Sequence, residues 1–248
     1  KRNGSEKEFE MPENCPVCGN PIRRIDTEAA FRCINPACGG VVREKLIHFA
    51  SRDAMDIEGL GPAVVDSLLA YRLVADAADF YALKEDDLRQ IERMGEKSAA
   101  NLITAIRASK ERGLAKLLFG LGIRFLGEKG SELAAHYFHT IDAIMAADVE
   151  TIEETEGIGK ITAKSLYDYF HDEKNIEMIN KLKNAGVLME EIKGESESGM
   201  FSGESVVLTG KLAVMGRREA SELIKRLGGT TQSSVTNTTT CLLYTSPS

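Results

Sequence analysis

The stretch Ile57-Glu58-Gly59-Leu60-Gly61 is the first of four similar turns around which this chain is organised. The other three turns read Ile91-Glu92-Arg93-Met94-Gly95, Ile123-Arg124-Phe125-Leu126-Gly127 and Thr155-Glu156-Gly157-Ile158-Gly159. Their last glycines lie at positions 61, 95, 127 and 159, so the steps between them are 34, 32 and 32 residues. A nearly constant step of this length is typical of a repeated supersecondary unit.

Apolar residues with helical spacing flank the turns. Offsets of 4, 7, 8 and 11 residues from Gly95 and Gly159 reach Ala99, Leu102, Ile103 and Ile106, and Ala163, Leu166, Tyr167 and Phe170. These offsets place the side chains on one face of a helix. A helical stretch also precedes each turn, as in Leu117-Leu118 and Leu121. The sequence therefore predicts a mainly α fold built from repeated units of helix, turn and helix.

The glycines and lysines of these turns indicate phosphate binding. Glycine permits a positive φ and lets a phosphate approach the backbone closely. The helix that follows directs its free N–H groups and positive dipole end toward the same place. The residues that we expect to contact such a phosphate are Gly59, Gly61, Gly95, Lys97, Gly127, Lys129, Gly157, Gly159 and Lys160. In place of the first glycine, we expect Arg93 to add charge near a phosphate and Phe125 only to pack.

The pattern apolar-x-Gly-apolar-Gly resembles the helix-hairpin-helix motif. Members of that class hold the DNA backbone without reading its sequence, and the resemblance implies the same here. The alternative is that the four turns are ordinary connections between the helices of a bundle. The net charge of −7 argues against a simple electrostatic DNA binder and predicts weak, salt-sensitive affinity.

Four of the five cysteines form the pattern C-x2-C-x14-C-x4-C at Cys15, Cys18, Cys33 and Cys38. Two pairs of thiolates at tight turns fit a tetrahedral Zn²⁺ site, and four protein ligands make it structural. A finger of this size cannot bury a sufficient core, so the metal supplies on the order of 10 kcal/mol of folding energy. Gly19 and Gly39 are expected to let the backbone turn around the sulfurs. Free or disulfide-bonded cysteines, and a redox Cys-x-x-Cys, are the alternatives.

The composition is that of an ordinary globular protein, with 248 residues, 43% hydrophobic and 28% charged, enough for about two domains. No apolar run has membrane-spanning length, and no signal peptide is visible. The start, Lys1-Arg2-Asn3-Gly4-Ser5, reads as an interior piece of a longer chain. Arg23, Arg24, Arg32 and Arg43, in or beside the cysteine module, are expected to touch phosphates or to form a solvated surface.

The C-terminal part alternates strand and helix patterns: Ser205 to Gly210 reads as a strand, Arg218 to Leu227 as a helix, and Val235 to Leu243 as another strand. This order resembles the first half of a BRCT domain. Thr209-Gly210 either faces a phosphate, as in phosphopeptide-binding members, or is only a strand-end turn. After Leu243 the family pattern does not continue, so we expect a truncated domain, and the tail is either native or non-native. An unpaired half-sheet is marginal, which predicts poor order beyond about residue 235.

Together these modules resemble the C-terminal part of the bacterial NAD-dependent DNA ligase family. Leu121-Gly122-Ile123-Arg124 and Gly95-Glu96-Lys97-Ser98-Ala99 are similar to that family more than to other helix-hairpin-helix proteins. The expected domains are a linker from a missing upstream barrel (1–11), a zinc finger (12–48), four helix-hairpin-helix units (49–192), a flexible linker (193–202) and the first half of a BRCT domain (203–248).

The resemblance implies a parent enzyme that seals nicks in duplex DNA during replication and repair. It would use NAD⁺ and Mg²⁺, bound by missing domains in which the lysine of a Lys-x-Asp-Gly motif is adenylated. These 248 residues contain no such motif. This piece would grip nicked double-stranded DNA as a monomer in the bacterial cytoplasm, without catalytic residues of its own and inactive alone. Two alternatives are a helix-hairpin-helix subunit of a repair nuclease or helicase, and a zinc and BRCT scaffold for protein interactions.

Overall fold

The computed structural model describes residues 11–24, 30–92, 94–192, 200–201, 203–210, 215–232, 234–237 and 239–244. The chain divides into two compact units, Lys1–Glu191 and Ile192–Ser248. Within the described ranges, every helix is too short or too polar to cross a membrane. Residues 1–10 of the first predicted linker, and residues 193–199 and 202 of the second, lie outside these ranges.

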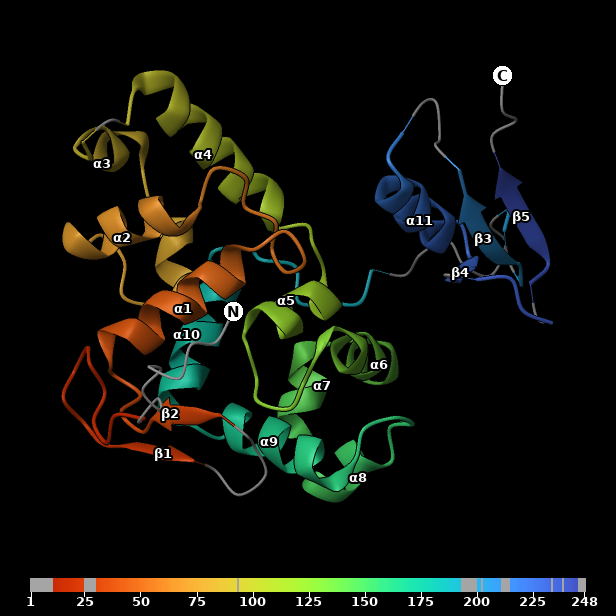
Figure 1. Ribbon diagram of the computed structural model, residues 1–248, viewed down its shortest axis with the longest axis horizontal. Helices are drawn as coiled ribbons and strands as arrows, with labels where there is room; N and C mark the ends of the chain where they lie inside the picture. Colours follow the sequence, from red (N-terminus) through yellow and green to blue (C-terminus); the bar gives the residue numbers. More distant parts are fainter. Residues whose placement is uncertain are drawn as a thin grey trace, which may run out of the picture. The chain divides into compact units, whose positions relative to one another are not determined.

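The first unit begins with a short β-hairpin and continues as a helical region (Figure 1). Its elements are β1 (Ile22–Arg24), β2 (Phe31–Cys33), α1 (Gly39–Ala50), α2 (Pro62–Ala70), η1 (Ala77–Ala82), α3 (Glu85–Arg89), α4 (Glu96–Ser109), α5 (Leu114–Gly120), α6 (Glu128–Phe138), α7 (Ile141–Ala146), α8 (Val149–Glu153), α9 (Lys160–Phe170) and α10 (Glu173–Asn184). The predicted mainly α fold is confirmed.

The four turns join α1 to α2, α3 to α4, α5 to α6 and α8 to α9. The first and fourth residues of each turn face inward: they are buried in the first, third and fourth turns, and in the second turn Ile91 is buried and Met94 half-buried. The apolar ones belong to, or pack against, one hydrophobic core that extends from Leu46 to Met189. In the first turn these side chains are Ile57 and Leu60, which are 3% and 4% exposed. The alternation of buried apolar and exposed positions therefore fixes which side of each turn faces solvent.

The β-hairpin has almost no core of its own. Strands β1 and β2 pair antiparallel, with Ile22 opposite Cys33, and their side chains are exposed or half-buried. Helix α1 follows directly after Cys38, and its C-terminal residues Phe49 and Ala50 are buried in the helical core. The expected domain boundary at residue 48 thus lies inside α1, which joins the cysteine module to the helices.

The second unit contains β3 (Ser205–Thr209), α11 (Arg217–Arg226), β4 (Thr230–Gln232) and β5 (Cys241–Tyr244). Strand β3 lies in the centre and pairs parallel with both β4 and β5. Its side chains Val206 and Leu208 pack against Ala220 and Ile224 of α11. Parallel strands on both sides of β3, with α11 joining β3 to β4, give this unit its α/β character.

The expected poor order beyond about residue 235 is wrong for residues 239–244. Strand β5 pairs with β3 along its whole length, and Ser205 N–H donates to Thr240 Oγ1 at 2.7 Å. The sheet is therefore not the unpaired half-sheet that the sequence suggested, because β3 has a partner on each side. The strand expected over 235–243 is also shorter and later, and residues 245–248 lie outside the described part.

Candidate zinc site and nucleic-acid interface

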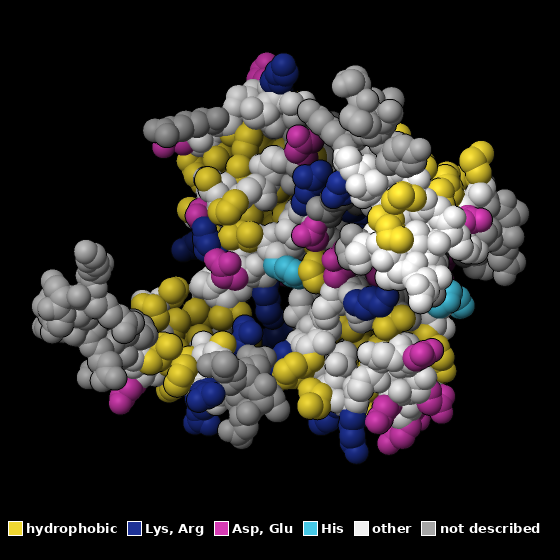
Figure 2. Space-filling model, turned by 45° about the vertical axis from the view of Figure 1, so that its right-hand side comes forward, with side chains coloured by type: hydrophobic (Ala, Val, Ile, Leu, Met, Phe, Trp, Pro, Cys, Tyr) yellow, Lys and Arg dark blue, Asp and Glu magenta, His cyan; other side chains and the backbone are white. Residues whose placement is uncertain are grey.

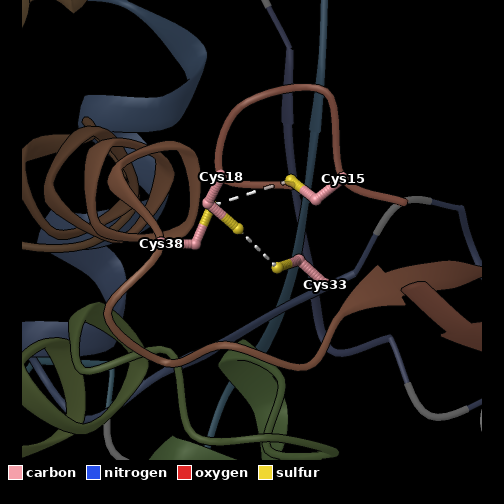
Figure 3. Close-up of side chains that lie close together, drawn as sticks. All are labelled: Cys15, Cys18, Cys33 and Cys38. Carbon is pink, nitrogen blue, oxygen red and sulfur yellow. Dashed lines mark hydrogen bonds between the residues drawn. The ribbon is translucent and has the colours of Figure 1, made fainter. Parts of the chain in front are cut away.

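The four cysteines of the N-terminal module come together at one point (Figure 3). All four Sγ atoms lie within 4.8 Å of one another; the Cys15–Cys38 distance is 3.8 Å and the Cys18–Cys33 distance is 3.4 Å. Sulfur ligands at about 2.3 Å from a tetrahedral zinc ion lie about 3.8 Å apart, so the donor set fits Zn²⁺. No other group of three or more potential ligands is found among the described residues.

Two backbone turns present these sulfurs. Gly19 has a φ of +70°, and its N–H donates to the Cys15 carbonyl at 2.8 Å. Around the second pair, the Asn35 side chain accepts a hydrogen bond from Ala37 N–H at 3.0 Å. The expectation for Gly39 is wrong, because Gly39 is the first residue of α1 and has no positive φ.

The electrostatics of the cluster require a cation. A hydrogen bond from the Asn20 backbone N–H is the main cause that lowers the pKa of Cys18 to about 6. The Asn35 backbone N–H acts in the same direction on Cys33, but burial and the neighbouring thiols outweigh it and raise its pKa to about 12. Four sulfurs this close cannot all ionise unless a positive charge compensates them. These residues form a four-cysteine zinc site, as predicted.

The four hairpin turns have the same local geometry. In each turn the fourth residue donates its N–H to the carbonyl of the first, over 3.1 Å in the first three turns and 2.9 Å in the last. The third residue has a positive φ: 86° at Gly59, 62° at Phe125 and 86° at Gly157. A positive φ at this position is the requirement of a type II turn. The corresponding Arg93 lies outside the described residues, so its predicted role is not seen.

The second glycine of each turn is the N-cap of the following helix and does not have a positive φ. The φ values are −80° at Gly61, −75° at Gly95, −83° at Gly127 and −86° at Gly159. Any residue can adopt this extended conformation. Of the two glycines in the pattern, only the first therefore uses the positive φ that glycine permits.

Among the described residues, nothing occupies the space beside these four N-caps. A β-carbon built on any of them would meet no described atom within 4 Å outside its chain neighbours, and none of the four helices has a side-chain cap. By contrast, Asp76, Thr140, Asp148 and Asp172 cap η1, α7, α8 and α10 with their side chains. At the N-termini of α2, α4, α6 and α9, the backbone is thus exposed to solvent and is not covered by a capping side chain.

The sequence-predicted lysines lie beside these open ends. Lys97, Lys129 and Lys160 are exposed in the first turns of α4, α6 and α9. In α2 the equivalent start is Pro62, which has no N–H to offer. All nine residues expected to contact a nucleic-acid backbone are exposed.

Other predicted contacts are placed differently. Arg43 binds both carboxylate oxygens of Asp66 and so ties α1 to α2; it is neither a free phosphate contact nor only a solvated residue. Arg23 and Arg32 lie opposite each other on the exposed β-hairpin. Phe125 was expected only to pack, but its side chain is 41% exposed.

Both charges are present on the surface. On the face drawn in Figure 2, the described residues include Lys and Arg as well as Asp and Glu side chains. This mixture agrees with the net charge of −7. Any anion binding by the hairpins must therefore be local, through amides and neighbouring lysines.

Comparison with known families covers most of the chain. Residues 14–39 match the NAD-dependent DNA ligase C4 zinc finger domain. This chain carries the C-terminal region of an NAD-dependent DNA ligase. Residues 51–108 match the SAM-like helix-hairpin-helix tandem, residues 116–179 the helix-hairpin-helix motif, and residues 196–248 the BRCA1 C Terminus (BRCT) domain.

Similar proteins support the same placement. The chain is 44% identical over 245 residues to a DNA ligase of Clostridioides difficile (strain 630), with 98% of the chain and 36% of that protein covered. It is 46% identical over 244 residues to a DNA ligase of Shouchella clausii and 44% identical over 244 residues to one of Bacillus subtilis, with 96% of the chain and 36% of each protein covered. The chain thus spans about a third of the length of the ligases it matches.

Proposed function

We propose that the helical region of this chain holds the sugar–phosphate backbone of nicked duplex DNA for a nick-sealing ligase, through the open N-termini of α2, α4, α6 and α9. The observation that carries this proposal is the bare glycine at each of the four N-caps. The fold requires glycine at none of them, because φ is negative and a β-carbon would have free space.

An external ligand explains the glycines. Asp or Ser at an N-cap stabilises a helix by a few tenths of a kcal/mol more than glycine does. A side-chain cap would, however, occupy the N–H groups that an incoming phosphate needs. Helix N-termini with free amides bind phosphates through hydrogen bonds and the helix dipole. Such contacts fix the backbone and carry no sequence information, which suits an enzyme that acts at any nick.

The parent reaction lies outside this chain in our proposal. A lysine in an upstream domain would take AMP from NAD⁺, with Mg²⁺ and release of nicotinamide mononucleotide, and pass the AMP to the 5′-phosphate at the nick. The 3′-hydroxyl would then attack that phosphate, form the new backbone bond and release AMP. This chain acts as a monomer in the bacterial cytoplasm and contributes its structural zinc and its DNA contacts, but no catalytic residue. The purified chain, incubated with labelled NAD⁺, is expected to gain no AMP, and covalent labelling of it would contradict that assignment.

The proposal is tested by adding a side-chain cap. Gly95→Asp, Gly127→Asp and Gly159→Asp each supply a carboxylate that accepts the free amides and repels a phosphate. We expect each zinc-loaded variant to keep its thermal stability and to bind nicked duplex about tenfold more weakly, the worth of one or two charge-assisted hydrogen bonds.

The matched control is Gly216→Asp, which makes the same change at an open glycine before α11 in the second unit. It should bind nicked duplex like the unmodified chain. Equal affinity of the hairpin variants would overturn the proposal. The affinity of the unmodified chain should also fall as salt rises, whereas a slope near zero would favour the protein-interaction scaffold.

A further inference from the structure

Phe125 occupies a position for which the fold prefers glycine. It is the third residue of its turn, where Gly59 and Gly157 stand in the first and fourth turns. Its φ of 62° is a conformation that a bulky side chain seldom adopts. A bulky residue held there requires a reason other than the turn itself.

Packing does not supply that reason. The Phe125 side chain is 41% exposed, and it is not part of the hydrophobic core. The guanidinium group of the neighbouring Arg124 lies over the ring, 4.9 Å from its centroid. The ring is thus held at the surface by an adjacent side chain and is not buried by the fold.

The surroundings of Phe125 are two of the open helix ends. It lies two residues before Gly127, the N-cap of α6. Its carbonyl oxygen accepts a hydrogen bond from Thr162 Oγ1 at 3.4 Å, and Thr162 belongs to the first turn of α9. Ile161, next to Thr162, is 57% exposed. Two large apolar residues therefore stand exposed where the third and fourth hairpins meet.

We propose that Phe125 is a specificity-determining residue that stacks on a sugar or base exposed at the nick, while the flanking hairpins hold the phosphates. This inference rests on the proposed function. An apolar side chain that lies between two phosphate contacts faces the groove of the DNA. In other proteins, apolar side chains in the minor groove insert between base steps and partly unstack the bases. Unstacking is easiest where the backbone is broken, so the ring favours nicked over intact duplex.

The test compares binding of the zinc-loaded chain to a nicked duplex and to an intact duplex of the same sequence, by fluorescence anisotropy. Phe125→Gly removes the ring, Phe125→Leu keeps an apolar side chain without a ring, and Phe125→Tyr keeps the ring. We expect the first two to reduce the preference for nicked duplex about tenfold, the scale of one aromatic stacking contact, and Phe125→Tyr to retain it.

The melting temperature separates stacking from packing. Phe125→Gly should melt no lower than the unmodified chain, because glycine adopts the positive φ freely. Three results would overturn the inference without affecting the proposed amide contacts. They are a lower melting temperature of Phe125→Gly, an equal loss of affinity for both duplexes, and an unchanged preference for nicked duplex in Phe125→Gly or Phe125→Leu. If the unmodified chain binds neither duplex, the proposed function itself fails.

Discussion

At the scale of single residues, the two glycine positions of each hairpin turn do different things. The first one serves the fold: Gly157 has a φ of 86°, and a β-carbon there would lie 2.7 Å from Leu133 Cδ1. The second one serves the surface: Gly159 has a negative φ and open space. The difference is measurable, because an alanine substitution should lower the free energy of unfolding strongly at the first position and only slightly at the second.

We expect Gly157→Ala to destabilise the helical region by about 2–3 kcal/mol, from the positive φ and the contact with Leu133. Gly159→Ala should cost less than about 1 kcal/mol, since alanine is only a poorer N-cap than glycine. Urea unfolding followed by circular dichroism measures both. Equal losses in the two variants would contradict this division of roles.

The sequence predicted the turns but not the roles within them. Their spacing and the apolar residues around them located all four hairpins, because both are local properties. Which glycine takes the positive φ depends on the register of the turn, which the sequence pattern left open; Gly61, Gly95, Gly127 and Gly159 do not take it. The residue in question is the third of the turn, so type II turn preferences contained the signal.

At the scale of elements, the cysteine module and the helical core depend on different forces. The β-hairpin is held at the zinc site, whereas the helices share a continuous apolar core that begins within α1. Arg43 and Asp66 add a tie between α1 and α2, and this ion pair lowers the pKa of Asp66. The cysteine spacing predicted the zinc ligands. The Arg43–Asp66 ion pair, in contrast, is a tertiary contact between distant residues, which sequence periodicity cannot show.

Removing zinc should therefore unfold the finger and spare most of the helices. We expect Cys18→Ser to lose the bound metal and to become sensitive to protease within residues 12–38, while its helical circular dichroism signal is largely kept. Cys241→Ser, which changes the remaining cysteine in the second unit, should retain about one zinc per chain. Loss of the helical signal together with the metal would show that the core needs the finger.

The small sheet of the second unit was the least predictable element. Strand β5 is held by pairing with β3, which lies more than thirty residues earlier in the chain. The local pattern placed a strand too early and suggested an unpaired edge. Pairing of this kind is decided by long-range contacts, which a reading of local propensity does not contain.

At the scale of the whole molecule, the chain combines a negative net charge with the four open helix N-termini that we propose as phosphate sites. A net charge of −7 disfavours general attraction to DNA, so the proposed sites can offset it only locally, where amides and lysines are presented. Binding should accordingly be modest in affinity, dependent on salt and blind to sequence. Within the parent ligase, such a region would hold the DNA while other domains carry out the chemistry.

The central claim is that backbone amides at the starts of α2, α4, α6 and α9 bind DNA phosphates. An NMR titration of the ¹⁵N-labelled, zinc-loaded chain with nicked duplex tests it most directly, because each amide reports its own contact. The account predicts the largest shift changes in the first turns of these helices, beside Gly61, Gly95, Gly127 and Gly159. Largest changes elsewhere, with these amides unmoved, would contradict it.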